Sequence, residues 1–359
     1  MSEQLFVIAE AGVNHNGDPG IGRELIDAAD DAGADAVKFQ TFRADELVSR
    51  DAPKAAYQQR TTGTEESHYE MIRRLELSEE DHRDLIAHAA ARDIAFLSTP
   101  FDLSSLRLLT ETFGLGLLKI GSGELTNLPF LLAAARASER LIVSTGMGSM
   151  AEVEQALGAI AYGFTVPGDV LPGPMDLAWA FADESGQGAL RDRVTLLHCT
   201  TEYPAAFDDV NLRAIETLAQ AFGLPVGYSD HTPGIHMAVA AVACGARVIE
   251  KHVTLDKTLP GPDHEASLEP DEFRQLVRHL RETDRARGDG VKRPTAAEWR
   301  NREVARKSLV AACPIVAGEP FTPQNLARKR PGTGRSPARY WDYLGQRADR
   351  DYATDELIR

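Results

Sequence analysis

Short apolar runs of strand length alternate with longer amphipathic segments along most of the chain. The apolar runs cover residues 5–9, 36–39, 94–97, 117–120, 141–143, 194–197, 226–228 and 247–249, and helix-like segments cover 21–32, 79–91, 150–161 and 271–287. Eight strands with nearly continuous apolar interiors and intervening helices predict an α/β fold, a (β/α)8 TIM barrel. An open doubly wound sheet is the second choice, and the lack of a G-x-G-x-x-G fingerprint counts against its dinucleotide-binding form.

Two regions interrupt this alternation. Residues 162–192 are rich in Gly and Pro and are predicted to be an insertion before the sixth strand, either a surface excursion or a lid. Residues 288–300 carry Gly, Pro and charges and are predicted to be a linker, and short apolar runs with a turn follow it. The predicted organisation is therefore a catalytic barrel (1–287), a linker (288–300) and a small C-terminal domain (301–359).

Two histidines stand just past the ends of consecutive predicted strands. His231 follows the strand at 226–228, His252 follows the strand at 247–249, and one helix of small residues joins the two strands. The carboxyl ends of neighbouring parallel strands lie side by side, and barrel active sites are built there. The two imidazoles are thus predicted to share a metal ion, the alternative being two histidines that are merely hydrogen-bonded at strand ends.

Polar groups also follow the other predicted strands. They include Glu10, Lys38, Gln40, Thr99, Lys119, Ser122, Ser144, Tyr203 and Ser229. A lysine inside an apolar strand is costly unless it is paired, so Lys38 and Lys119 need an anion. The Gly-Ser-Gly turn at 121–123 and the Ser-Thr-Gly turn at 144–146 suit phosphate oxygens. There are two alternatives to an anion-binding role: the lysines form buried ion pairs with Glu10 or Glu124, or one of them forms a Schiff base with the substrate.

The net charge and the cysteine content limit which binding partners and which cellular location the sequence predicts. The net charge of −15 argues against nucleic acid and against an anionic membrane, because both are bound through excess positive charge. The three cysteines lack CxxC spacing and predict reduced thiols in a cytoplasmic protein. The first residues lack the pattern of a signal peptide, and no apolar run approaches the length that spans a membrane.

The motifs together resemble the bacterial sialic acid (N-acetylneuraminate) synthase family. They are IAEAGVNHNG at 8–17, VKFQT at 37–41, KIGSGE at 119–124, STGM at 144–147, LHCT at 197–200, YSDHT at 228–232 and PGPD at 260–263. The sequence KRPGTG at 329–334 is similar to the signature of that family's C-terminal antifreeze-like (SAF) domain. The resemblance implies a metal-dependent synthase that joins phosphoenolpyruvate to an open-chain N-acyl mannosamine-type sugar, giving a nine-carbon 2-keto acid and phosphate.

The resemblance also implies roles for individual residues. It makes His231 and His252 ligands of a divalent metal, Mn²⁺ or Mg²⁺, and it places Glu10, Lys38 and Lys119 with them in the catalytic set. The implied phosphoenolpyruvate site consists of Lys38, Thr99, Lys119, Ser122, Ser144 and Ser229. The implied sugar site consists of Glu10, Gln40, Tyr203, Asp263 and Arg330. The family looks like domain-swapped homodimers, so Arg330 is expected to reach the N-acyl arm of the sugar in the partner chain.

The sequence leaves alternatives open for the exact sugar substrate and for the class of function. Thr201-Glu202 looks more like synthases of diacetyllegionaminic acid, so the sugar is either N-acetylmannosamine or its 2,4-diacetamido-2,4,6-trideoxymannose analogue, the latter slightly favoured. A Schiff-base aldolase using Lys38 or Lys119 would act without a metal. A non-enzymatic carbohydrate-binding protein would not need the polar strand ends at all.

Overall fold

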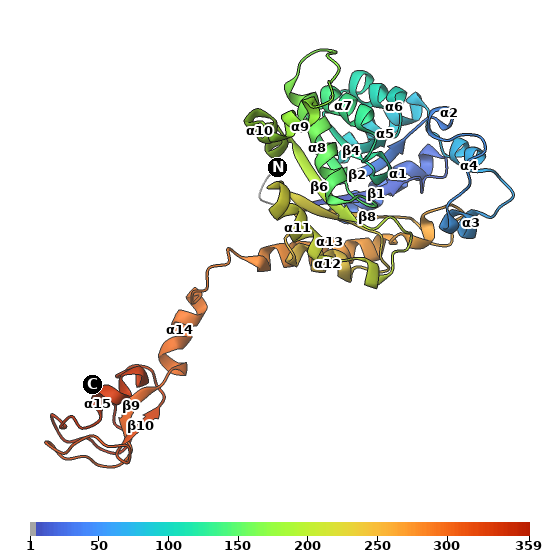
Figure 1. Ribbon diagram of the computed structural model, residues 1–359. Coiled ribbons are helices and arrows are strands. Elements are labelled where there is room, and N and C mark those ends of the chain that lie inside the picture. Colours follow the sequence, from blue (N-terminus) through green and yellow to red (C-terminus); the bar gives the residue numbers. More distant parts are fainter. Residues whose placement is uncertain (1–4) are drawn as a thin grey trace. The chain divides into compact units, whose positions relative to one another are not determined.

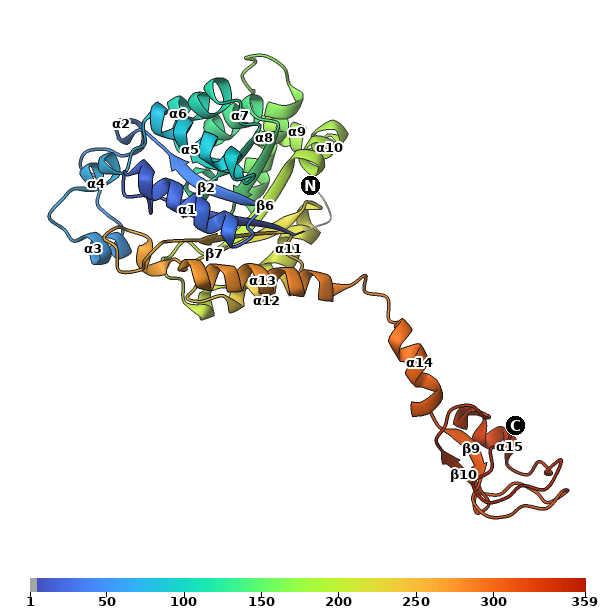
Figure 2. The same cartoon turned by 180° about the vertical axis from the view of Figure 1, so that it is seen from behind.

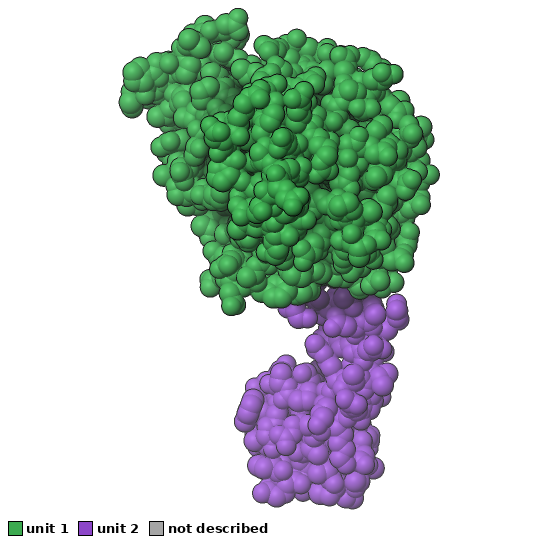
Figure 3. Space-filling model, turned by 90° about the vertical axis from the view of Figure 1, so that its right-hand side faces the viewer, with its two compact units in different colours: residues 1–288 green, residues 289–359 purple. Residues whose placement is uncertain are grey.

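The computed structural model describes residues 5–359, which form two compact units that meet in the sequence between residues 288 and 289 (Figure 3). The larger unit contains eight parallel strands in one sheet. They are β1 (Phe6–Gly12), β2 (Ala36–Thr41), β3 (Ala95–Pro100), β4 (Leu117–Ile120), β5 (Arg140–Ser144), β6 (Val194–Cys199), β7 (Val226–Asp230) and β8 (Val248–His252). Their order is β3-β2-β1-β8-β7-β6-β5-β4, and the edge strands β3 and β4 pack together, so the sheet closes on itself. The predicted (β/α)8 barrel is confirmed.

Helices surround this sheet (Figures 1 and 2). They are α1 (Pro19–Asp31), α2 (Ala44–Leu47), α3 (Ala56–Thr62), α4 (His68–Arg74), α5 (Glu79–Ala91), α6 (Leu103–Arg107), α7 (Leu128–Ala137), α8 (Met150–Thr165), α9 (Asp176–Ala182), α10 (Glu184–Arg193), α11 (Arg213–Phe222), α12 (His236–Ala243) and α13 (Pro270–Arg287). Several begin at side-chain caps that the sequence supplies: Asp18 caps α1, and Ser78 and Ser149 form capping boxes with Asp81 and Glu152. No helix of the described residues is long and apolar enough to cross a membrane.

The inward face of the strands changes character along the barrel axis. Near the strand starts, Ile8, Ala36, Leu97, Ile142, Leu197 and Val248 pack into one buried cluster. Two residues later, on the same face of the strand, Ile8 is followed by Glu10, Leu97 by Thr99, and Val248 by Glu250. Side chains on one face of a strand repeat every two residues. The barrel therefore has an apolar plug with a charged layer directly above it.

Both regions that interrupt the alternation of strands and helices contain helices of their own. Helix α8 runs to Thr165, and α9 and α10 pack against it on the outside of the barrel. No described residue of 162–192 lines the main cavity, so the insertion is a surface excursion and not a lid over it. Within the predicted linker, a capping box of Thr295 and Glu298 starts helix α14 (Ala296–Ala305).

The smaller unit has its own core. Strands β9 (Ser308–Ala311) and β10 (Leu326–Lys329) pair in antiparallel fashion, and α15 (Tyr340–Tyr343) packs beside them. Its buried cluster is Leu309, Ala311, Ile315, Phe321, Leu326, Ala348, Tyr352 and Ile358. This unit is therefore a compact module of short strands and turns.

A buried ion pair stabilises the turn that carries His231. Lys251 Nζ lies 2.9 Å from Asp230 Oδ2, both side chains are fully buried, and Asp230 Oδ1 accepts hydrogen bonds from the backbone N–H and the hydroxyl of Thr232. Removing one partner of such a pair leaves an uncompensated buried charge. We therefore expect Lys251→Met to lower the free energy of unfolding, measured by urea titration, by about 3–5 kcal/mol.

Lys257→Met is the matched control. Lys257 pairs with Glu272 at 2.5 Å, but both side chains are about a third or more exposed. Loss of an exposed pair costs at most about 1 kcal/mol. Equal losses in the two variants would contradict a structural role for the buried pair.

Candidate active site

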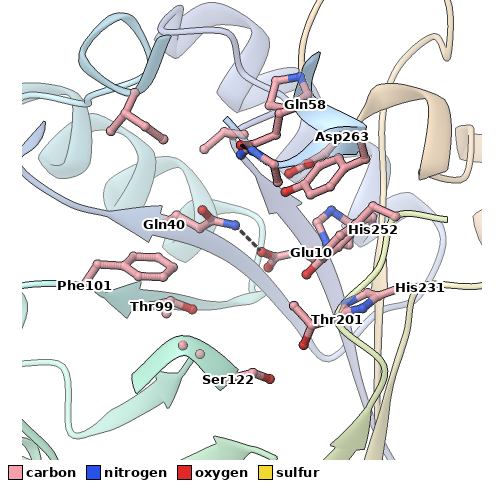
Figure 4. A pocket seen from close by; sticks show the side chains of 18 of the residues that line it. Glu10, Gln40, Gln58, Thr99, Phe101, Ser122, Thr201, His231, His252 and Asp263 are labelled. Atoms are coloured by element: carbon pink, nitrogen blue, oxygen red, sulfur yellow. Dashed lines mark hydrogen bonds between the residues drawn. The ribbon is translucent and has the colours of Figure 1, made fainter. Parts of the chain in front are cut away.

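A cavity of about 730 Å³ opens at the carboxyl ends of the barrel strands. Twelve of the residues predicted from the sequence line it: Glu10, Lys38, Gln40, Thr99, Lys119, Ser122, Ser144, Tyr203, Ser229, His231, His252 and Asp263. Figure 4 shows the amide of Gln40 pointing towards Glu10, with Thr99 and Ser122 below them and the two histidines on the right. Arg330 belongs to the smaller unit, where its Nε donates to the carbonyl of Ala305.

Four charged side chains form the floor of this cavity. Lys38 Nζ lies 2.6 Å from Glu10 Oε2 and 3.6 Å from Glu250 Oε2, and Lys119 Nζ lies 3.5 Å from Glu250 Oε1. All four side chains are at most 5% exposed. Ser229 Oγ also donates to Glu250 Oε1 at 2.7 Å. Glu250 is thus shared between two lysines and a hydroxyl.

Burial and these contacts set the charge of the floor. Burial alone would raise the pKa of Glu250, but Lys119 and Lys38 outweigh it and hold the pKa at about 2. Burial would lower the pKa of Lys38, but the carboxylates of Glu10 and Glu250 raise it above its usual value. Burial lowers the pKa of Lys119 and raises that of Glu10. Glu250 is therefore ionised at neutral pH, and the N–H groups of Lys38 and Lys119 beside it are donors that an anion could use.

The alternative prediction, that the two lysines form ion pairs with Glu10 or Glu124, holds for one lysine and not for the other. Lys38 does pair with Glu10, but Lys119 pairs with Glu250, because Glu124 lies in the following turn and accepts from Asn127 instead. Two hydroxyl oxygens in the cavity wall, those of Ser144 and Thr201, are buried without a hydrogen-bond partner among the described residues. Unsatisfied buried hydroxyls are rare in folded proteins and mark places where a ligand completes the bonding.

His231 and His252 face each other beside the floor. Their ring centroids are 5.7 Å apart, and the ring of Tyr203 lies 4.2 Å from His231 and 5.6 Å from His252. Burial lowers the pKa of His231 to about 4, and burial together with His231 lowers the pKa of His252 well below its usual value. Both imidazoles are therefore neutral at pH 7, which is the form that binds metals.

The hydrogen bonds of the pair suit a divalent ion. His231 Nδ1 donates to the carbonyl of Thr200 at 2.6 Å, so the lone pair is on Nε2, which lies 3.3 Å from Ser229 Oγ. Among the described residues, the buried Nδ1 of His252 has no hydrogen-bond partner. A backbone carbonyl on the second ring nitrogen is the usual support of a metal-binding histidine. No cluster of three His, Cys, Asp or Glu groups able to hold a metal occurs among residues 5–359. Two nitrogens from the chain would leave the remaining positions to substrate and water.

The residues that the resemblance assigned to the sugar, apart from Arg330, line the same cavity as the histidines. Gln40 Nε2 donates to Glu10 Oε1 at 3.2 Å, and the ring of Tyr57 lies 5.0 Å from that of Tyr203. Asp263 is buried, and burial together with Glu10 raises its pKa to about 7, although Lys38 opposes the shift. Figure 4 shows Asp263 and Gln58 on the side of the cavity away from Thr99 and Ser122.

Several lining residues were not assigned from the sequence. Glu250 precedes His252 by two positions and shares its face of β8, so the period of a strand could have revealed it. Tyr57, Gln58 and His68 come from the segment between β2 and β3, and no strand-end pattern points to them.

Comparison with known proteins gives a consistent result. The model of the NeuB family matches residues 25–292, and the SAF domain matches residues 306–359. The chain is 49% identical over 357 residues to the N,N'-diacetyllegionaminic acid synthase of Campylobacter jejuni subsp. jejuni serotype O:2, covering 99% of both chains. It is 44% identical to the enzyme of that name from Legionella pneumophila subsp. pneumophila, covering 96% of this chain and 91% of the relative.

A solved structure is also similar. The crystal structure of the N-acetylneuraminic acid (sialic acid) synthetase from Leptospira borgpetersenii serovar Hardjo-bovis is 32% identical, with a TM-score of 0.67. The alignment covers 83% of this chain and 90% of that one. The predicted antifreeze-like domain and the resemblance to sialic acid synthases are confirmed by these matches.

The raised pKa of Asp263 predicts a pH dependence of stability. Between the ordinary value of 3.8 and about 7, the folded state binds a proton at Asp263 that the unfolded state has lost. Stability owed to this group is therefore present at low pH and is lost as the pH rises towards 7. We expect Asp263→Asn to become increasingly stable relative to the wild type from pH 4 to pH 8, by about 1.4 kcal/mol per unit of pKa shift.

The measurement is urea unfolding of metal-free, ligand-free protein at each pH, compared between variants. Asp271→Asn is the control, because Asp271 is 87% exposed at its side chain on α13 and should show no such trend. A difference between Asp263→Asn and the wild type that stays constant with pH would contradict a raised pKa.

Proposed function

The chain belongs to the NeuB family, and we propose that it joins phosphoenolpyruvate to 2,4-diacetamido-2,4,6-trideoxymannose, giving N,N'-diacetyllegionaminate and phosphate. One observation carries this proposal above all others. Two buried lysines share one ionised carboxylate at the floor of a barrel cavity, directly beside two neutral histidines. A small molecule with a phosphate and a carboxylate can thus be held next to a polarised carbonyl compound.

The choice of sugar rests on the relatives and on one dipeptide. The two relatives cited above, at 49% and 44% identity, carry the name N,N'-diacetyllegionaminic acid synthase. Thr201-Glu202 lines the cavity beside Tyr203, where a sugar would lie. Phosphoenolpyruvate with N-acetylmannosamine, giving N-acetylneuraminate, is the alternative within the same family.

In this proposal, different residues of the cavity bind the two substrates. Lys38, Lys119, Thr99, Ser122, Ser144 and Ser229 would bind the phosphate and carboxylate of phosphoenolpyruvate. Glu10, Gln40, Tyr203 and Asp263 would hold the sugar so that C3 of the enol ether faces the aldehyde carbon. Water addition at C2 then allows phosphate to leave. Burial of the floor excludes other water and strengthens each electrostatic contact.

A divalent metal at His231 and His252, Mn²⁺ or Mg²⁺, is part of the proposal. When bound, it would supply Lewis acidity toward the sugar aldehyde and water. Both imidazoles are neutral, and one is oriented by a backbone carbonyl, which supports this role. A cytoplasmic location is proposed as well, because the three cysteines are free thiols.

We expect phosphate release from phosphoenolpyruvate to depend on the sugar and on a divalent ion. EDTA should abolish it, Mn²⁺ should restore it, and His231→Ala or His252→Ala should lower kcat/KM by more than about 100-fold. His236→Ala is the matched control, because His236 starts α12 and does not line the cavity. Full activity in EDTA, or borohydride trapping of the sugar on Lys38 or Lys119, would contradict this chemistry.

We also propose a domain-swapped homodimer in which Arg330 completes the sugar site of the partner chain. Of its guanidinium N–H groups, only Nε is bonded within the described residues, to the carbonyl of Ala305. A planar donor fork suits an N-acyl oxygen better than a lysine would. The separate core of the smaller unit is compatible with exchange between chains.

Mixing two inactive variants tests this arrangement. Arg330→Ala keeps an intact barrel and His252→Ala keeps an intact SAF domain, so each homodimer should be nearly inactive. Random exchange makes about half of the dimers hybrid, with one intact site each, so about a quarter of wild-type activity should return. Lys329→Ala should stay active alone. Proven subunit exchange without recovered activity would mean that Arg330 acts on its own barrel or not at all.

A further inference from the structure

One wall of the cavity comes from helices and loops rather than from strand ends. Residues 47–75, which include α3 and α4, contribute Leu47, Val48, Pro53, Lys54, Ala55, Ala56, Tyr57, Gln58, His68, Met71, Ile72 and Leu75. Behind it, Val13, Phe42, Met71 and Leu75 form a small apolar cluster of their own, against which Leu47, Ile72 and Phe101 pack. This wall, which we call the α4 wall, is therefore mainly apolar, in contrast to the charged floor.

Side-chain bonds hold the α4 wall in place. Lys54 is buried, and its Nζ donates to Thr62 Oγ1 at 3.0 Å and to the carbonyl of Gly63 at 3.1 Å. Arg60 Nη2 donates to the carbonyl of Tyr203 at 3.2 Å, which ties the segment to the sugar side of the cavity. The ammonium of Lys54 is occupied by these bonds, so it braces the wall and is not free for a ligand.

His68 is one of four polar side chains in this wall, together with Lys54, Tyr57 and Gln58. Neither of its ring nitrogens has a hydrogen bond within the described part of the chain, and Nδ1 is buried. Burial and the nearby Lys54 lower the pKa of His68, so the ring is neutral. A neutral imidazole offers one donor and one acceptor. It can therefore pair with either the N–H or the C=O of an amide.

We propose that His68 and Ile72 form a subsite for the 4-acetamido group and the C6 methyl group of the sugar. The inference rests on the proposed function, which puts the sugar aldehyde at His231 and His252 and so directs the far end of the sugar away from the strand ends. The imidazole pairs with the amide, and Ile72 packs against the methyl groups. N-acetylmannosamine would instead place its C6 hydroxyl group against Ile72, and burying a hydroxyl group without a partner is costly.

The test measures kcat/KM for the diacetamido sugar and for N-acetylmannosamine, with phosphoenolpyruvate kinetics followed in parallel. His68→Leu should lower kcat/KM for the diacetamido sugar about tenfold, which is the value of one hydrogen bond, and leave N-acetylmannosamine within about twofold. His68→Gln keeps a donor and an acceptor and should recover most of the loss. Ile72→Ser should shift the preference about tenfold toward N-acetylmannosamine. The KM for phosphoenolpyruvate should not change in any variant.

Arg73→Gln is the matched control on the same helix, because Arg73 is exposed and does not line the cavity. Thermal unfolding of each variant separates lost contacts from lost folding. If the wild type turns over neither sugar, the proposed function itself fails, and the subsite with it. If the wild type prefers N-acetylmannosamine, both the proposed sugar and the subsite are wrong. If the wild type prefers the diacetamido sugar but His68→Leu and Ile72→Ser change kcat/KM for both sugars by the same factor, or change neither, only the subsite is wrong.

Discussion

The ionised carboxylate of Glu250 is the interaction on which the active-site floor depends. Lys38 and Lys119 are both buried, and two like charges at this depth would repel each other and lose their hydration. Glu250 lies within 3.6 Å of both ammonium groups and is itself bonded by Ser229. Its pKa of about 2 means that it is charged at neutral pH. The floor is therefore organised before any substrate arrives.

This arrangement explains how a strongly acidic chain can bind an anion. The net charge of −15 is spread over the whole molecule, whereas the floor contains two lysines in a space that water cannot easily screen. Glu10 has a raised pKa and so compensates the lysines less completely than Glu250 does. The local field of a cleft decides the binding of a small ligand, and the overall charge does not.

The barrel and most of the floor could be predicted because both follow from the period of a strand. Apolar runs marked the strands, and the polar residues that follow them, such as Lys38 and His231, had to meet at one end of the barrel. Glu250 was missed because the polar sequence Glu-Lys-His was interpreted as the end of the strand. In the structure β8 continues to His252, so Glu250 is part of the strand. The α4 wall gave no such signal, because its residues approach the cavity through tertiary packing that no local pattern records.

The two sides of the cavity differ in how they are held, and this difference has a functional consequence. Ladder hydrogen bonds between neighbouring strands fix the floor, so Glu10 sits opposite both Lys38 and His252 in the register of the sheet. A few side-chain bonds, chiefly those of Lys54 and Arg60, hold the α4 wall. Substitutions in the wall can therefore alter its shape and polarity while the charged floor keeps its geometry. A barrel of this kind can retain one condensation reaction while its far wall is adapted to a different sugar.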